Sequence, residues 1–333
     1  MRNAIVLAAG KGTRMKSDQS KVMHTIIDRP MLAYIIDALK AVNVQRIVVI
    51  VGYQAETIKA YFKDVEFALQ EPQLGTGHAV MQATQLKDEE GETIIINGDG
   101  PCIQKETLEK LFEMNKDASC TLLTSVLEDG KHYGRIVRNE DGNVTGIVEA
   151  KDCTEEQLKI CEINAGMYCF KNRDLFDNLD KLETNNAQKE YYLTDMVKIL
   201  ASQGKKVNGY IIEDRDEVMG INDCVELNVA YSWMRDRINL NLMKNGVQIV
   251  DPKRTVIGKD VVIGHDVVIH PNTEILGNTV IGNHVEILGG SYIKDSTIQE
   301  GSIVDFSKVV NSTVEANSTV GPLSYVLNDE KIR

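Results

Sequence analysis

The sequence of the last quarter of the chain repeats with a period of six residues. Isoleucine recurs in register, and a β-branched or small residue stands two positions before each isoleucine. The isoleucines are Ile257, Ile263, Ile269, Ile275, Ile281, Ile287 and Ile293, and the preceding residues are Thr255, Val261, Val267, Thr273, Thr279, Val285 and Ser291. Such hexapeptide repeats are typical of a parallel β-helix, whose aliphatic side chains stack along the axis of the coils.

The register slips by one residue at Ile298, continues through Val304 and Val310, slips again to Val314 and ends at Val320. With about 18 residues in each three-sided coil, residues 256–323 predict about four coils. A sandwich of short strands would instead show period-two alternation with turns every 8 to 12 residues. The six-residue period therefore favours the β-helix.

The remainder of the chain alternates short β-branched runs with helical patterns. Runs at 4–9, 46–52 and 93–98 are separated by amphipathic stretches at Met31–Val42 and Ala55–Phe62. This alternation predicts a mostly parallel sheet covered by helices. We therefore expect an α/β fold, in which a Rossmann-like mixed-sheet domain precedes a short parallel β-helix.

Later runs at 120–126 and 163–170 are less regular and indicate a mixed extension of the sheet, with a hairpin turn at Asp141 and Gly142. A helix from Asp223, its predicted cap, to Lys244 would connect the two parts. The predicted divisions are a first domain at 1–222, a connecting helix and linker at 223–250, and the β-helix at 251–333.

Composition narrows the possible partners. The chain has 37 Lys and Arg against 49 Asp and Glu, a formal charge of −12, which argues against binding to nucleic acid or an anionic membrane. No run approaches the ~18 apolar residues of a membrane-spanning helix, and the N-terminal apolar run is too short for a signal peptide. The six cysteines show no CxxC pair or zinc-ligand spacing, so we expect a reduced, cytoplasmic protein.

A glycine-rich loop follows the first predicted strand. Gly10 and Gly12 let the backbone approach an anion, while Lys11 and Arg14 add positive charge, which suits a phosphate group. The loop lacks the third glycine of the dinucleotide fingerprint and the GK[ST] ending of a P-loop. Taken alone, it also fits a plain tight turn.

Further motifs follow this loop in a specific order. They are LAAGKGTRM from Leu7, KVMH from Lys21, LQEPQLGTGHA from Leu69, NGDGP from Asn97, YGRI from Tyr133, GIVEAKD from Gly146, EINAG from Glu162, NNAQKEYYLTD from Asn185 and GIND from Gly220. The ordered set resembles the sugar-1-phosphate nucleotidyltransferases, and specifically the GlmU-type uridylyltransferases, over essentially the whole chain.

The resemblance implies transfer of a uridylyl group from UTP to N-acetylglucosamine 1-phosphate, with Mg²⁺ as cofactor, as a step towards peptidoglycan precursors. It assigns catalysis to Arg14 and Lys21, and metal binding to Asp99 and Asn222. Nucleotide binding is assigned to Leu7, Ala8, Ala9, Gly10, Lys11, Gly12, Gln70, Gly75 and Thr76, and sugar binding to Gly98, Tyr133, Gly134, Glu149, Lys151 and Asn164. A left-handed β-helix of this kind also implies a homotrimer.

Simpler roles remain open for several of these residues. Asp99 also fits a turn before Gly100, Asn222 fits a helix cap or a turn, and Thr76 fits a helix cap. Along an extended chain, Glu149 and Lys151 would share one exposed strand face.

Thr194 and Asp195 are expected to begin a helix through Leu200. We expect no acid–base role for His24 and His78. His265, His270 and His284 are expected to face solvent or a subunit contact rather than a metal.

The chain departs from the family pattern at four positions: Asn97, Gly100, Ala165 and Lys189. The repeat also stops near Val320, before the coils that carry the acetyltransferase residues in bifunctional relatives, so we expect no acetyltransferase activity. Two alternatives follow from these departures. One is a nucleotidyltransferase for another sugar 1-phosphate, such as glucose 1-phosphate, and the other is a weakly catalytic nucleotide-binding scaffold.

Overall fold

The computed structural model describes residues 1–328 and 331–332. The chain divides into two compact units, the first formed by Met1–His24 with Pro30–Glu226 and the second by Thr25–Arg29 with the chain from Leu227 onward. Within the described residues, no helix combines the length and apolar character needed to cross a bilayer.

A nine-stranded mixed sheet forms the centre of the first unit, with the main strand order β11-β7-β10-β6-β1-β4-β5. The strands are β1 (Arg2–Ala8), β4 (Arg46–Val51), β5 (Glu66–Leu69), β6 (Glu92–Asn97), β7 (Cys120–Val126), β10 (Glu162–Lys171) and β11 (Val207–Ile211). β1 lies parallel to both β4 and β6, whereas β10 runs antiparallel between β6 and β7. The predicted mixed sheet is confirmed.

Two further strands, β8 (Arg135–Arg138) and β9 (Val144–Val148), form the predicted antiparallel hairpin, and β8 also pairs with β10. Gly142 in the hairpin turn has a φ of 81°, which suits glycine. The pairing of β10 with β7 is irregular between Asn164 and Tyr168.

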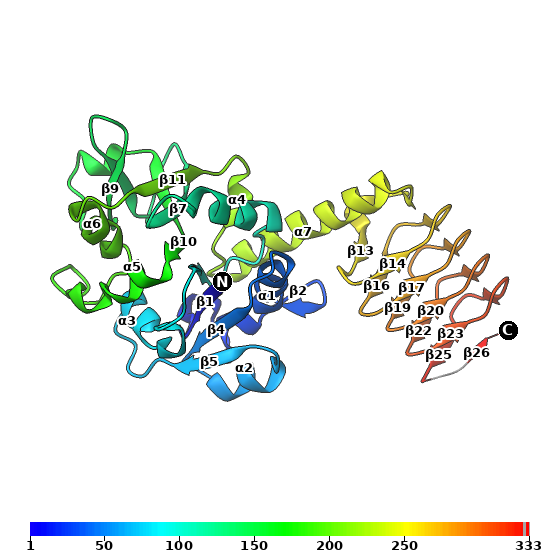
Figure 1. Ribbon diagram of the computed structural model, residues 1–333. Coiled ribbons are helices and arrows are strands. Elements are labelled where there is room, and N and C mark those ends of the chain that lie inside the picture. Colours follow the sequence, from blue (N-terminus) through cyan, green and yellow to red (C-terminus); the bar gives the residue numbers. More distant parts are fainter. Residues whose placement is uncertain (329–330, 333) are drawn as a thin grey trace. The chain divides into compact units, whose positions relative to one another are not determined.

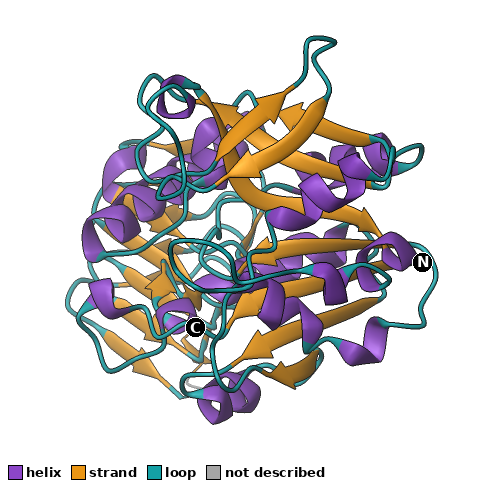
Figure 2. Cartoon of the chain, turned by 90° about the vertical axis from the view of Figure 1, so that its left-hand side faces the viewer, coloured by secondary structure: helices purple, strands orange, loops and turns teal. Residues whose placement is uncertain are grey.

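Helices cover both faces of the sheet, as Figure 2 shows for this unit. The helices α1 (Met31–Ala41), α2 (Ala55–Tyr61) and α4 (Lys105–Asn115) pack on one face, and α3 (Thr76–Met81), α5 (Asn172–Phe176) and α6 (Asp195–Ser202) pack on the other. Strand alternation produces the two cores, because Ala4 and Val6 of β1 belong to one apolar cluster and Ile5 belongs to the other.

The connecting helix α7 (Cys224–Lys244) begins as the sequence predicts. Asp223 Oδ1 accepts hydrogen bonds from the backbone N–H groups of Val225 and Glu226, each at 2.9 Å. Gly246, just beyond the helix, has a φ of 94°. A side-chain cap and a left-handed glycine therefore mark the two ends of this helix.

The second unit is a left-handed parallel β-helix, whose described strands form three five-stranded sheets (Figure 1). One sheet contains β12 (Gln248–Ile249), β15 (Val268–Ile269), β18 (Glu286–Ile287), β21 (Ile303–Val304) and β24 (Thr319–Val320). The second contains β13 (Thr255–Ile257), β16 (Thr273–Leu276), β19 (Tyr292–Lys294), β22 (Lys308–Val310) and β25 (Tyr325–Leu327). The third contains β14 (Val262–Ile263), β17 (Val280–Ile281), β20 (Thr297–Ile298), β23 (Thr313–Val314) and β26 (Lys331–Ile332).

The stacked core differs from the predicted repeat in two respects. Ile293 pairs with Val309, which is fully buried, whereas Val310 is only half-buried. The prediction that Val310 continues the repeat is therefore wrong by one residue, because that coil is shorter than 18 residues. The stack also extends beyond Val320 to the buried Val326, and β12 adds a strand before residue 256, so each face has five strands where about four coils were predicted.

Candidate functional site

The glycine-rich loop leaves the carboxyl end of β1 and leads into two short 3₁₀ helices at Thr13–Met15 and Lys21–Met23. Gly12 has a φ of 64°, and a Cβ built on it would lie 2.6 Å from Lys21 Cβ. Only glycine therefore allows the loop to pack this closely against Lys21.

Four of the predicted residues meet in one polar cluster. Lys21 Nζ lies 2.5 Å from Asp99 Oδ2 and 3.0 Å from Asn222 Oδ1. Arg14 Nη2 donates to the same Asn222 Oδ1 at 2.8 Å. The glycine-rich loop, the end of β6 and the segment before α7 thus converge, as a site at the carboxyl ends of parallel strands requires.

Backbone contacts hold this cluster in place. The N–H of Gly98 donates to Leu7 O at 2.8 Å, and the N–H of Ile221 donates to Asp99 O at 2.9 Å. A Cβ on Gly98 would lie 3.0 Å from Leu7 O. The N–H of Asn222 donates to Glu226 Oε2 at 2.6 Å, so Asn222 is fixed by a side chain of the first turn of α7.

The oxygens of Asp99 and Asn222 fit a divalent cation. Both face the same ammonium group, so their lone pairs already point at one positive charge. One carboxylate and one amide oxygen match the few protein ligands that Mg²⁺ takes when phosphates and water complete its shell. The donor set therefore suits Mg²⁺ at this position.

A pocket of about 260 Å³ opens beside the cluster. Nine predicted residues line it: Leu7, Arg14, Thr76, Asp99, Tyr133, Gly134, Glu149, Asn164 and Asn222. The other predicted residues do not: Ala8, Ala9, Gly10, Lys11, Gly12, Lys21, Gln70, Gly75, Gly98 and Lys151. Among these, Lys21 contacts the lining residues Asp99 and Asn222. Gly75 directly precedes the lining residue Thr76, and Gln70 donates a hydrogen bond to Gly75 O.

One wall of the pocket carries a desolvated acid. Burial raises the pKa of Glu149, as do the nearby charges of Asp152 and Asp195, and a hydrogen bond from Thr194 opposes the rise. That bond joins Thr194 Oγ1 to Glu149 Oε1 over 3.1 Å. Glu149 is therefore held toward the pocket by the residue at the start of α6.

The predicted shared face of Glu149 and Lys151 is wrong. β9 ends at Val148, and the chain turns immediately, with the N–H of Asp152 donating to Glu149 O at 2.9 Å. The turn leaves Lys151 exposed and outside the pocket lining.

The irregular part of β10 places Asn164 in the same wall. Its Nδ2 donates to the hydroxyl of Tyr168 at 2.6 Å, and its Oδ1 accepts from the N–H of Gly166 at 3.1 Å. Burial raises the pKa of Tyr168, so this hydroxyl stays protonated at neutral pH. Tyr168 could not be identified from the sequence, because a tyrosine in an apolar strand normally indicates core packing.

Arg135 supports the site although no role was predicted for it. Its guanidinium is almost fully buried and donates to the backbone carbonyls of Gly130, Lys131 and Tyr133. These bonds hold the loop that presents Tyr133 and Gly134. The only trace of this role in the sequence was the arginine of the YGRI motif, directly after Tyr133 and Gly134.

Gln70 organises the segment that the sequence predicts to bind the nucleotide. This side chain is buried, and its Nε2 donates to Gly75 O at 2.9 Å. Gly75 has a φ of 106°, and a Cβ on it would lie 2.6 Å from Tyr191 O. Thr76 does not cap α3 as the simpler interpretation held, because its Oγ1 accepts from the N–H of Leu193 at 3.0 Å.

Lys11 lies apart from the cluster of Lys21, Asp99 and Asn222. Its Nζ is 5.4 Å from the centre of the Tyr53 ring, and the backbone N–H of Tyr53 donates to Ala9 O. A cation–π contact therefore holds Lys11 near the outer edge of the loop.

His24 and His78 lie in surroundings that indicate a structural rather than an acid–base role. Burial lowers the pKa of His24, and its Nε2 is buried without a hydrogen-bond partner. His78 lies between the amides of Gln70 and Gln82 and stacks against Tyr191. Neither histidine lines the pocket.

Three of the four departures from the family pattern lie in the pocket wall. Asn97, Gly100 and Ala165 line it, and Asn97 Nδ2 would lie only 2.6 Å from a Cβ on Gly166. Lys189 adopts a left-handed conformation with a φ of 55°, which explains why glycine suits that position better.

Comparisons with known proteins match both parts of the chain. A family model described as the MobA-like NTP transferase domain matches residues 4–197, and the bacterial transferase hexapeptide (six repeats) model matches residues 260–295. The chain is 45% identical to the bifunctional protein GlmU of Limosilactobacillus reuteri, over 99% of this chain and 74% of that protein. It is 47% identical to the bifunctional protein GlmU of Clostridium beijerinckii, over 97% of this chain and 72% of that protein.

A solved structure of HddC from Yersinia pseudotuberculosis has the same fold over 70% of this chain and all of its own, with a TM-score of 0.52 and 23% identity. The GlmU relatives, by contrast, align along almost the entire chain at much higher identity. On this basis the chain belongs to the GlmU family of nucleotidyltransferases.

Proposed function

We propose that the protein transfers a uridylyl group from UTP to N-acetylglucosamine 1-phosphate, with Mg²⁺, and releases pyrophosphate. The observation that carries the proposal is the convergence of Lys21, Asp99, Asn222 and Arg14 beside a pocket whose other wall is polar. In this family the reaction is an in-line attack of a sugar-phosphate oxygen on the α-phosphorus, so positioning and charge neutralisation supply the rate.

The basic side chains suit the phosphates. Arg14 and Lys21 share the amide oxygen of Asn222, so both cations face one small volume. They would hold the triphosphate and stabilise the charge that develops on the departing pyrophosphate. Bound by Asp99 and Asn222, Mg²⁺ would supply further charge neutralisation at the phosphate oxygens.

The polar wall suits the sugar. Glu149 would accept hydrogen bonds from sugar hydroxyls, and the amide of Asn164 would bind the N-acetyl group. Thr194 and Tyr168 fix these two side chains and so reduce the freedom lost when the sugar binds. Gln70 and Thr76 are proposed to recognise the uracil edge from the opposite side.

Steady-state kinetics test the proposal. Pyrophosphate release is measured with UTP and either N-acetylglucosamine 1-phosphate or glucose 1-phosphate, and we expect a higher kcat/KM for the N-acetylated sugar. A reversed preference would establish the alternative sugar. We expect Asp99→Ala to lower kcat by at least ~10²-fold, because loss of fixed charge stabilisation costs a few kcal/mol.

A folded protein that releases no pyrophosphate with any nucleotide and sugar pair would support the scaffold alternative instead. Circular dichroism provides the control for folding, and Asp117→Ala is the matched variant, because Asp117 is an exposed acid that pairs with Lys206 outside the pocket.

We further propose a homotrimer that assembles through the β-helix, in the cytoplasm. Val262 and Val280 pair on neighbouring strands and are 61% and 42% exposed, which leaves apolar side chains available for a second copy. The six cysteines are free, as a reducing compartment requires. Analytical ultracentrifugation should give three times the chain mass, and a stable monomer at micromolar concentration would contradict the trimer.

A further inference from the structure

Two histidines and an aspartate meet at one corner of the β-helix. Ile263 pairs with Ile281, so Asp266 and His284 occupy equivalent positions on successive coils, with φ of 56° and 57°. The N–H of His284 donates to His265 O at 3.0 Å. The two corners are therefore held in register by the backbone of the coils.

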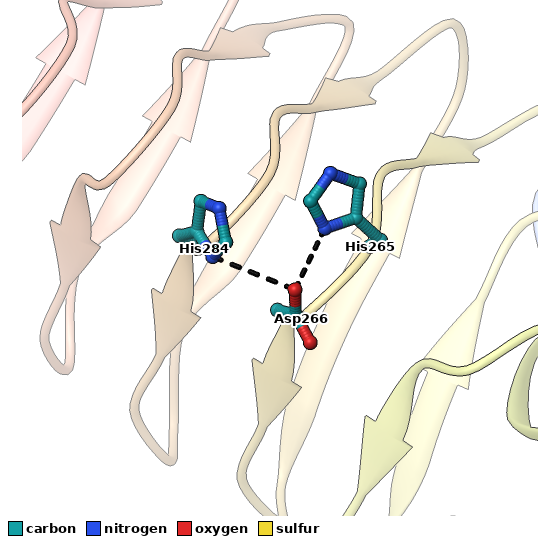
Figure 3. A group of neighbouring side chains, drawn as sticks. All are labelled: His265, Asp266 and His284. Carbon is teal, nitrogen blue, oxygen red and sulfur yellow. Dashed lines mark hydrogen bonds and ion pairs between the residues drawn. The ribbon is translucent and has the colours of Figure 1, made fainter.

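Their side chains point toward one another (Figure 3). Asp266 Oδ2 lies 2.7 Å from His265 Nδ1 and 3.7 Å from His284 Nδ1, so one carboxylate oxygen faces two imidazole nitrogens. One ligand atom from each of the three residues lies within 4.8 Å of the others. The imidazole rings meet edge to face, with centroids 5.0 Å apart.

We propose that His265, Asp266 and His284 bind a divalent transition-metal ion such as Zn²⁺. Two neutral imidazoles and a carboxylate are ligands that Zn²⁺ accepts, at about 2.0–2.2 Å, and three protein ligands leave one position for water. Tetrahedral bonds of that length place ligand atoms roughly 3.3 Å apart. Small rotations of these exposed side chains would achieve this spacing.

A hydrogen bond alone does not account for the cluster. Asp266 already satisfies His265, whereas 3.7 Å is too long for a hydrogen bond to His284 Nδ1. A cation placed among the three ligand atoms would bind both nitrogens and the carboxylate together.

A fourth side chain supports His284 from the next coil. Glu300 Oε1 lies 3.9 Å from His284 Nε2, the ring nitrogen that does not face Asp266. Carboxylates commonly accept a hydrogen bond from the second nitrogen of a metal-bound histidine and fix its orientation. Glu300 is therefore assigned as a positioning residue, which a movement of less than 1 Å would bring into hydrogen-bond range.

The bound ion would link successive coils of the β-helix. Because it would bind the folded corner and not the unfolded chain, it would raise the melting temperature in a concentration-dependent way. The residues of the proposed site belong to the second unit.

Zinc titration calorimetry tests the site in the full chain, with excess Mg²⁺ present throughout. The double variant His265→Asn with His284→Asn should keep the fold, because asparagine already occupies comparable positions in the β-helix. Asn283 takes the position of His265 on the next coil, and Asn317 adopts the left-handed conformation of His284, with a φ of 59°. The variant retains all six cysteines, so zinc binding to thiols cancels in the comparison.

We expect the wild type to bind one more Zn²⁺ per chain than the double variant. The double substitution should lower the affinity for Zn²⁺ at this site by at least ~100-fold. Glu300→Gln should weaken it by about 10-fold. His270→Asn is the matched control and should leave binding unchanged, because the His270 side chain contacts Glu286 at 3.0 Å and is not part of the proposed site.

A second readout uses Co²⁺, whose visible spectrum reports nitrogen ligation. The wild type and the His270→Asn variant should give a four- or five-coordinate spectrum that the double variant lacks. Equal zinc stoichiometry and affinity in the wild type and the folded double variant would overturn the proposal. So would a cobalt spectrum that is unchanged by the double substitution.

Discussion

The ammonium group of Lys21 lies 2.5 Å from the carboxylate of Asp99, and both side chains are largely shielded from solvent, with 16% and 22% of their surfaces exposed. The same ammonium contacts Asn222 Oδ1 at 3.0 Å. Lys21 therefore occupies the position between the two oxygens that a bound cation would take. A divalent ion can bind to these two oxygens only if Lys21 moves away. We expect the Lys21 ammonium to contact phosphate oxygens of the nucleotide instead.

This relationship predicts opposite effects of two substitutions on metal binding without nucleotide. Lys21→Met removes the competing charge and should raise the affinity for Mn²⁺, whereas Asp99→Asn removes a ligand charge and should lower it. Both should reduce kcat by about 10²-fold or more, because each removes charge stabilisation of the transition state. Mn²⁺ binding is measured by electron paramagnetic resonance, and a lower affinity in Lys21→Met would contradict the competition.

Glu149 predicts a pH dependence of stability. Burial raises its pKa above the ordinary value of 4.5, so the folded state holds this proton more tightly than the unfolded chain does. Its contribution to stability is complete below the unfolded pKa and is lost as the pH rises through the folded pKa. Glu149→Gln should therefore increase the free energy of unfolding at pH 7 while raising KM for the sugar phosphate.

The control for Glu149 is Glu162, which behaves in the opposite way. Burial raises the pKa of Glu162, but hydrogen bonds from Arg138 and Thr124 outweigh it and lower the pKa overall. Glu162→Gln should thus decrease stability at pH 7. Urea unfolding at several pH values measures both variants, and equal signs for the two substitutions would refute the assignment of Glu149 as the desolvated acid.

Lys189 tests backbone strain in the loop before α6. Relief of its left-handed conformation is worth ~1–2 kcal/mol, and the greater freedom of glycine in the unfolded chain costs ~0.5–1 kcal/mol. Lys189→Gly should therefore increase the free energy of unfolding by about 0.5–1 kcal/mol. Lys189→Ala retains the Cβ and should give no gain, so equal stability of the two variants in urea unfolding would argue against strain.

The corrected register of the β-helix predicts unequal effects of two neighbouring valines. Val309 is fully buried in the stack and Val310 is half-buried. Val309→Ala should destabilise the protein by about 2 kcal/mol through lost burial and a residual cavity, and Val310→Ala by less than about 1 kcal/mol. Thermal unfolding measures the difference, and a larger loss in Val310→Ala would support the register expected from the sequence.

Local patterns predicted most of the fold. Alternating apolar runs identified β1, β4 and β6, and the caps at Asp223 and Gly246 located α7. The repeat identified the β-helix, because each isoleucine had to point to the same axis. The register beyond Ile298 was harder, since Val309 and Val310 are adjacent valines and only the length of the coil decides which one points inward.

The site was only partly accessible from sequence. The glycines and charges of the loop indicated phosphate binding, and strand position placed Asp99 at a carboxyl end. Arg135 stabilises a loop, and Tyr168 stabilises an irregular part of a strand. Neither feature produces a periodic pattern in the sequence, so neither role could be predicted from it. The contact between His265 and His284 likewise depends on how the coils stack. The repeat spacing predicted only that both histidines face solvent or a subunit contact.

A crystal structure with Mg²⁺ and a UTP analogue that resists transfer tests the central claim most directly. We expect the ion to bind Asp99 and Asn222, the triphosphate to lie against the loop of Gly10 and Gly12, and Lys21 to leave Asp99 for a phosphate oxygen. A triphosphate bound in another cavity, with Lys21 still paired to Asp99, would contradict the account.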